Sequence, residues 1–117
     1  MSTRDLTISW LPAQEFATPI KLADNESIKA VAWNTWTTAV MTAQVSNDNG
    51  VTWLELMNAD LGATINAKAN SAHVLTAEEK DTWSCWPLIR FRSGTLATDV
   101  HQHATSIYTM SVKIEVA

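Results

Sequence analysis

The stretch Ser106-Ile107-Tyr108-Thr109-Met110-Ser111-Val112-Lys113-Ile114-Glu115-Val116 decides the fold class. From Tyr108 onward its apolar and polar residues alternate almost without interruption, which places them on opposite faces of a half-buried β-strand. Shorter segments rich in β-branched and apolar residues occur at 27–33, 39–46, 51–56 and 88–92. The chain is therefore predicted to be all-β.

Turn residues separate these segments, notably Asn47 to Gly50 and Ser93-Gly94-Thr95. Short strands with such punctuation are typical of a single-domain antiparallel β-sandwich or jelly roll. The one helix signal is the capping box at Thr76–Glu79, which predicts a short helix near residues 77–83 that bridges the two sheets.

The 117 residues are enough for one domain, 1–117, and leave no room for a second. Residues 1–26 are assigned to an N-terminal arm and the first strands. Residues 58–72 are polar and small, so they are expected to form a long exposed loop, the favoured contact element.

Hydrophobic residues make up 46% of the chain and charged residues 17%, which is the composition of a packed globule. The net charge is -4 and the basic residues are scattered, so nucleic acid is not expected as a partner. No apolar run suggests a signal peptide or a membrane anchor. A single cysteine, Cys85, cannot form an internal disulfide and favours folding in a reducing compartment.

The sharpest local motif is carried by Ser46, Asp48, Gly50 and Trp53, which fit the Asp-box pattern Ser-x-Asp-x-Gly-x-Thr-Trp of sialidase-like propellers. Asp48 can accept hydrogen bonds from turn amides, Gly50 supplies a positive φ, and Trp53 can fold back over the turn. Propellers repeat this box once per blade, whereas here it occurs once. The motif is interpreted as a structural hairpin without a catalytic role.

Few residues of the sequence could bind a metal or act in catalysis. Asp99, His101 and His103 could share one strand face, but same-face neighbours stand ~6 to 7 Å apart, so a metal would need a further ligand. Nothing ties His73 to them, and Cys85 is expected to be packed and inert between two tryptophans. No Gly-x-Ser-x-Gly elbow is present. We therefore expect no catalytic residues, no metal site and no cofactor: the protein is not predicted to be an enzyme.

The six tryptophans are the strongest hint of a binding surface. A sandwich of this size is not expected to shelter all of them, so two or three should be exposed. The candidate interface residues are Trp33, Trp36, Trp83 and Trp86. Exposed rings could stack on sugars in a carbohydrate-binding module or anchor a protein interface, and the scarcity of charged groups near Trp33 and Trp36 mildly favours the protein interface.

The segments 45–56, 89–95 and 100–102, in this order, resemble small virion proteins of tailed bacteriophages. The resemblance covers roughly residues 27–116, and its motifs are turn and strand signatures of modest specificity. It implies a capsid decoration or cement protein: a small β-sandwich, made in the host cytoplasm, that binds the outer capsid surface and stabilises the shell. The implied partners are the major capsid protein and copies of this chain, as a dimer or trimer. Alternatives are a tail, neck or fibre-associated sandwich, or a carbohydrate-binding module. The tryptophan-rich segment 82–86 has no counterpart in the pattern.

Overall fold

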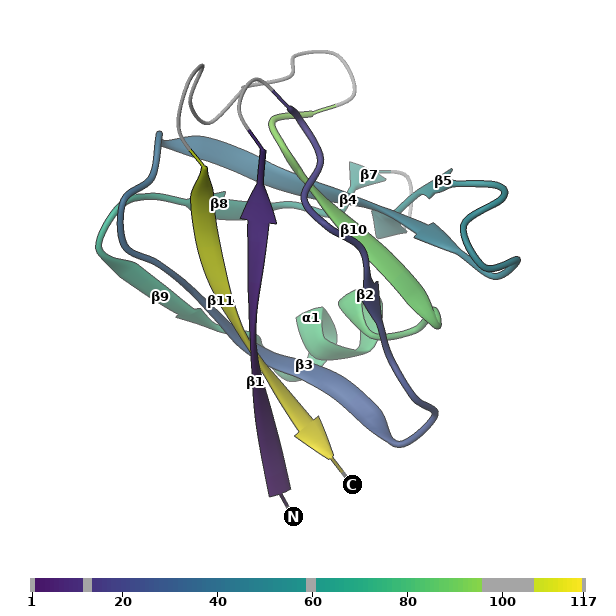
Figure 1. Cartoon of the computed structure of the whole chain (residues 1–117). Helices are drawn as coiled ribbons and strands as arrows, with labels where there is room; N and C mark the ends of the chain where they lie inside the picture. The colour runs from purple at the N-terminus through teal and green to yellow at the C-terminus, as the bar shows by residue number, and fades with distance from the viewer. Residues whose placement is uncertain (1, 12–13, 59–60, 96–106, 117) are drawn as a thin grey trace.

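The computed structural model describes residues 2–11, 14–58, 61–95 and 107–116, which fold as two antiparallel sheets packed face to face (Figure 1). The first, sheet A, has the strand order β1-β11-β3-β9. Its strands are β1 (Ser2–Trp10), β3 (Glu26–Trp33), β9 (Ser71–Val74) and β11 (Tyr108–Val116). The predicted all-β sandwich is confirmed.

Sheet B has the order β2-β10-β4-β5, with β8 also paired to β4. Its strands are β2 (Ile20–Lys21), β4 (Ala39–Ser46), β5 (Leu54–Glu55), β8 (Ile65–Ala67) and β10 (Leu88–Ser93). A two-stranded hairpin joins β6 (Met57–Asn58) to β7 (Leu61–Gly62). Within the segment 51–56, predicted as a strand, only Leu54–Glu55 form one, because the preceding turn continues through Thr52.

The core lies between the sheets and follows the period of two. On β11, Met110, Val112 and Ile114 are buried while Thr109, Ser111 and Lys113 are exposed. A register shift at Lys113/Ile114 changes the alternation on β3, so that Ile28, Val31 and Trp33 all face inward. The final strand is covered on both sides from within the chain, by β1 and by β3.

The helix α1 (Ala77–Trp83) forms where the capping box predicts it. Thr76 accepts a hydrogen bond from the Glu79 amide, and the Glu79 carboxylate accepts one from the Thr76 amide. Lys80 forms an ion pair with Glu115 on sheet A, and the Trp83 ring stacks on Phe91 of sheet B at 5.6 Å. The helix thus connects the two sheets, as expected.

The segment 58–72 is not the long exposed loop that the sequence suggested. It contains β7 and β8 and the start of β9, and the side chains of Ala63, Ile65 and Ala67 are buried. The alternation was present but was carried mostly by alanine, a weak β-former, which hid the strand.

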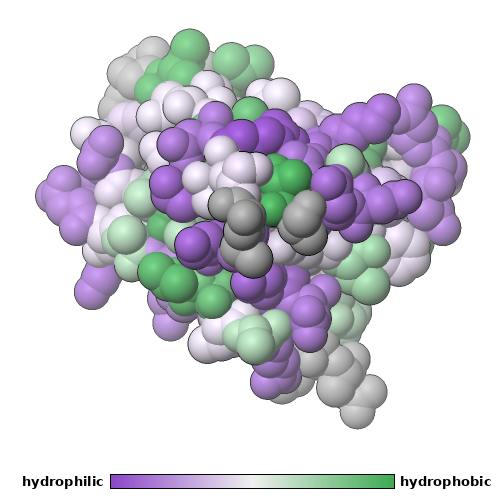
Figure 2. Space-filling model, turned by 90° about the horizontal axis from the view of Figure 1, so that it is seen from below, coloured by the Kyte–Doolittle hydropathy of each residue, from purple (hydrophilic) through white to green (hydrophobic). Residues whose placement is uncertain are grey.

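Both described chain ends lie close together, because β1 and β11 pair along their whole length (Figure 1). Figure 2 shows this end of the sandwich, where hydrophilic residues are interspersed with small, separate apolar patches.

Candidate functional site

The predicted hairpin motif forms as a hydrogen-bonded turn after β4. The Ser46 hydroxyl donates to Asp48 Oδ1 at 2.7 Å and accepts from the Gly50 amide at 2.9 Å. Asp48 Oδ1 also accepts from the Thr52 amide at 2.8 Å. This amide, followed by the Ser46 hydroxyl, holds the pKa of Asp48 below its usual value. The Ser46 hydroxyl and the Asp48 carboxylate are therefore used to shape the turn.

Trp53 attaches the turn to the outer face of sheet B through a contact with Arg90. The guanidinium carbon of Arg90 lies 4.3 Å from the Trp53 ring centroid and 4.0 Å from that of Phe16. Arg90 Nε also donates to Gln44 Oε1 at 3.0 Å. The stacked cation thus joins β10 to the hairpin and to the segment before β2.

Glu55 makes a second attachment to the same face. The Arg92 guanidinium donates from both terminal nitrogens to the two Glu55 oxygens, at 2.7 and 2.8 Å. Gln44 donates to Glu55 as well, and Glu15 lies 3.7 Å from Arg92 Nε. The hydrogen bonds from Arg92 are the main reason that the pKa of Glu55 is lowered.

We call residues 46–57 the hairpin arm. In Figure 1 this part of the chain, around the β5 label, projects sideways from the body of the sandwich. Three of its apolar side chains are exposed: Val51 at 83%, Leu54 at 46% and Met57 at 48%. The arm therefore presents apolar side chains outward while Trp53 and Glu55 hold its base rigidly on sheet B.

The sequence did not identify the residues that hold the arm, namely Phe16, Gln44, Glu55, Arg90 and Arg92. One signal was available. The alternation in 88–92 places Arg90 and Arg92 on the same outward face, and two neighbouring arginines on one sheet face need acidic, amide or aromatic partners.

The predicted tryptophan interface is wrong for three of its four residues. Trp33, Trp36 and Trp83 are exposed by only 2%, 6% and 2%, and Trp86 is partly buried against the core. Trp10 and Trp36 pack edge to face at 4.8 Å, and Trp33 lies 6.1 Å from Trp36. The sandwich shelters these rings because they pack on other aromatic rings within the core: Trp10 and Trp33 both pack on Trp36, and Trp83 stacks on Phe91.

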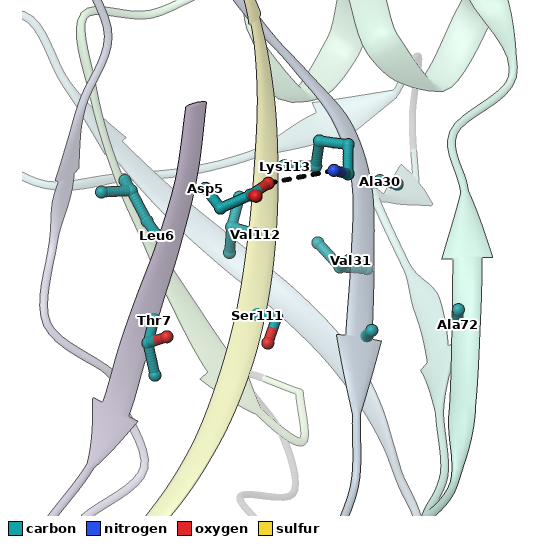
Figure 3. A pocket seen from close by; sticks show the side chains of 10 residues that line it. Asp5, Leu6, Thr7, Ala30, Val31, Ala72, Ser111, Val112 and Lys113 are labelled. Carbon is teal, nitrogen blue, oxygen red and sulfur yellow. Dashed lines mark ion pairs between the residues drawn. The ribbon is translucent and has the colours of Figure 1, made fainter. Parts of the chain in front are cut away.

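A second surface feature is a shallow hollow of about 360 Å³ on the outer face of sheet A (Figure 3). Strand register aligns one small residue from each strand across it: Thr7, Ser111, Ala32 and Ala72. The Asp5–Lys113 ion pair, 3.1 Å between Oδ1 and Nζ, borders this row. The hollow is open and holds no convergent set of titratable groups.

Other candidate groups remain dispersed. Asp99, His101 and His103 lie outside the described residues, and within those residues no cluster of three or more metal-ligating side chains occurs. His73 Nε2 lies 3.0 Å from both carboxylate oxygens of Glu79 beside α1. Cys85 is exposed, contrary to expectation, because it follows the end of α1 and only Trp83 and Trp86 turn toward the core.

Comparison with known proteins gives no relative: no family model, no curated protein and no solved structure matches this chain. Within the described part of the chain, no helix combines the length and apolar character needed to span a bilayer.

Proposed function

We propose that this protein is a structural subunit of a bacteriophage virion, most specifically a decoration protein that binds the outer capsid surface. The observation that carries the proposal is the hairpin arm, which projects from the sandwich, is anchored by side-chain contacts at its base and exposes Val51, Leu54 and Met57. Such a group of apolar side chains on a rigid element is suited to docking against a protein surface.

The resemblance to phage virion proteins supports the same role. Its segments 45–56 and 89–95 come from distant parts of the chain, yet β4 and β10 pair directly, from Leu88 opposite Ser46 to Ser93 opposite Met41. Arg90 and Arg92 then bind Trp53 and Glu55 of the arm. Two of the three resembling segments thus form one structural unit, which bears the exposed apolar residues; the third, 100–102, lies outside the described residues.

Rigidity matters because docking a flexible loop costs conformational entropy. The internal hydrogen bonds of Ser46 and Asp48 fix the arm before binding. A single arm offers a small contact area, so stable attachment to a shell would depend on many copies binding a repeating lattice.

The test is a binding experiment with purified full-length chain and expanded capsids of the phage that encodes it. Co-sedimentation at stoichiometric copy number and a higher melting temperature of the decorated shell are expected. Lack of binding excludes the decoration role. Quantitative mass spectrometry of the virion then separates locations, since hundreds of copies indicate the shell and a few indicate the tail or neck.

A carbohydrate-binding module is the second candidate, but it needs a different platform from the one predicted. Trp33, Trp36 and Trp83 are buried, whereas Trp53, Phe16 and Trp86 are half-buried. Of these, Trp53 and Phe16 both stack on Arg90 beside Gln44 and Glu55 and would form the platform. Glycan-array binding that Trp53→Ala removes would favour this candidate over the virion role.

A further inference from the structure

The edge strands of the two sheets differ greatly in length. Proteins commonly protect sheet edges by keeping edge strands very short, because an open edge pairs with other strands. Among the described strands, β2 and β5 have two residues, β8 has three and β9 has four. Strand β1 has nine, paired on one side with β11 and on its other side with no named strand.

The backbone groups that β1 turns outward can be identified. The Ser9 carbonyl accepts a hydrogen bond from the Thr18 amide at 3.2 Å, so Ser9 faces away from β11. In an antiparallel pair, successive residues turn their N–H and C=O groups to alternate sides. Thr3, Asp5 and Thr7 therefore also face outward, and no backbone hydrogen bond from the described residues reaches them there.

The charges on β1 do not guard this edge. The Arg4 guanidinium binds Glu26 and donates to the Lys21 carbonyl at 3.3 Å, and Asp5 binds Lys113. Both charged side chains thus have an ion-pair partner within the chain. The strand contains no proline, and its nine register pairs with β11 run without a bulge.

We propose that β1 pairs antiparallel with β1 of a second copy of this chain, joining two A sheets into one continuous sheet. Leu6 supports this occupant, because it packs on the core yet stays partly exposed at the open edge. A second sandwich placed edge to edge covers that remaining surface in both copies.

The register of this pairing follows from the sequence of β1. A two-fold axis normal to the sheet keeps each face continuous, so the axis passes midway between one residue and the same residue of the other copy. Centring on Arg4 or Asp5 sets like charges directly opposite each other, which destabilises a pair. Centring on Thr7 places Asp5 opposite Ser9, whose carbonyl is already used by Thr18.

Centring on Leu6 avoids the like-charge pairs and keeps both Asp5–Thr7 pairs complete, because the Ser9 carbonyl used by Thr18 then lies opposite Thr3, at the end of the pairing. Asp5 of each copy then lies opposite Thr7 of the other, where their outward amides and carbonyls can exchange hydrogen bonds and the Thr7 hydroxyl can donate to the Asp5 carboxylate. The two Leu6 residues meet in a non-hydrogen-bonded pair, with Cα atoms about 4.5 Å apart.

A cysteine cross-link tests this register in the full-length chain. In a Cys85→Ser background, Leu6→Cys should form an intermolecular disulfide efficiently, because the expected Cα separation is within disulfide range. Thr3→Cys is the matched control: its two copies would stand six residue steps apart, about 20 Å, and should not cross-link. Equal cross-linking of both variants, or none of Leu6→Cys, overturns the proposal.

Light scattering after size-exclusion chromatography provides the second measurement. The unmodified chain should be a dimer at high concentration, and Thr7→Pro, which removes an outward amide at a position where an edge strand tolerates proline, should be a monomer. If Thr7→Pro does not fold, the cross-linking result decides alone. A monomer at every concentration overturns the proposal and leaves the edge to a strand of another protein. The pairing does not depend on the virion role, so absence of capsid binding would not contradict it.

Discussion

The Arg92 guanidinium forms a two-pronged hydrogen-bonded ion pair with Glu55, with N–O distances of 2.7 and 2.8 Å. Arg92 belongs to β10 and is only 2% exposed, whereas Glu55 belongs to the hairpin arm. The pair therefore connects the outer face of sheet B to the element proposed to bind the capsid. Its loss should affect both the stability of the fold and the position of the arm.

Replacing Glu55 with alanine should lower the free energy of unfolding by about 2 to 3 kcal/mol, because it leaves a buried guanidinium without its main counter-charge. Glu55→Gln keeps an acceptor for Arg92 and should cost less. Urea denaturation measures both. A change within about 0.5 kcal/mol for Glu55→Ala would show that Glu15, 3.7 Å away, replaces the lost partner.

The same ion pair predicts a dependence of stability on pH. The pKa of Glu55 is lowered in the folded state relative to its usual value of 4.5. Its contribution is therefore fully present above that value and disappears as the pH falls through the lower folded-state value. Other lowered carboxyl groups, among them Glu26 and Glu115, share this trend. The difference in unfolding free energy between the unmodified chain and Glu55→Gln should shrink as the pH falls below about 4.5. A constant difference would contradict the assignment.

Gly50 should be the sensitive position of the turn. Its φ is 88°, and a Cβ there would lie 3.5 Å from Leu88, which is ordinary contact. The cost of Gly50→Ala is therefore conformational, about 1 kcal/mol. Asn49, with φ 62°, is the matched control, since Asn49→Gly relieves a positive φ and should be neutral or slightly stabilising. Thermal unfolding of both variants checks the contrast. Equal changes in stability for Gly50→Ala and Asn49→Gly would mean that the turn adopts another backbone conformation in the alanine variant.

The exposed residues of the arm should matter for binding and not for folding. Val51→Asp and Leu54→Asp should weaken capsid binding at least tenfold and change the unfolding free energy by less than about 0.5 kcal/mol. Val74→Asp is the control, because Val74 is also apolar and 68% exposed but lies on β9 of sheet A. If Val74→Asp weakens binding as much as the arm variants do, the capsid contact lies elsewhere.

Local pattern predicted the strands and the helix well, because alternation and capping are short-range signals. The β11 alternation, the α1 capping box and the Ser46–Asp48 turn all formed where the sequence placed them. Contacts between residues far apart in the sequence could not be predicted in this way. Two or three exposed indoles were expected because of the size of the sandwich, whereas Trp10 and Trp33 are both buried against Trp36.

Only part of the candidate site could be predicted from the sequence, for the same reason. The turn residues Ser46, Asp48, Gly50 and Trp53 stand within one short segment, so their spacing reveals them. The residues that anchor them, Phe16 and Arg90, lie in other parts of the chain. Arg90 contacts Trp53 and Phe16 because β10 pairs with β4. Pairing between distant strands depends on the whole topology, which no local period encodes.

The tryptophan cluster offers a test in which two similar rings are expected to behave differently. Trp10 Nε1 donates to the Glu15 carbonyl at 2.9 Å, whereas Trp33 Nε1 is buried with no acceptor among the described residues. Both indoles are almost completely buried and both contact Trp36, so substitution by phenylalanine removes similar volume from each. Trp10→Phe also loses a hydrogen bond, while Trp33→Phe removes a donor whose burial is uncompensated. Trp10→Phe should therefore be the more destabilising by about 1 to 2 kcal/mol in urea denaturation. If Trp33→Phe costs as much or more, Trp33 Nε1 has an acceptor in the native protein, and its burial is compensated after all.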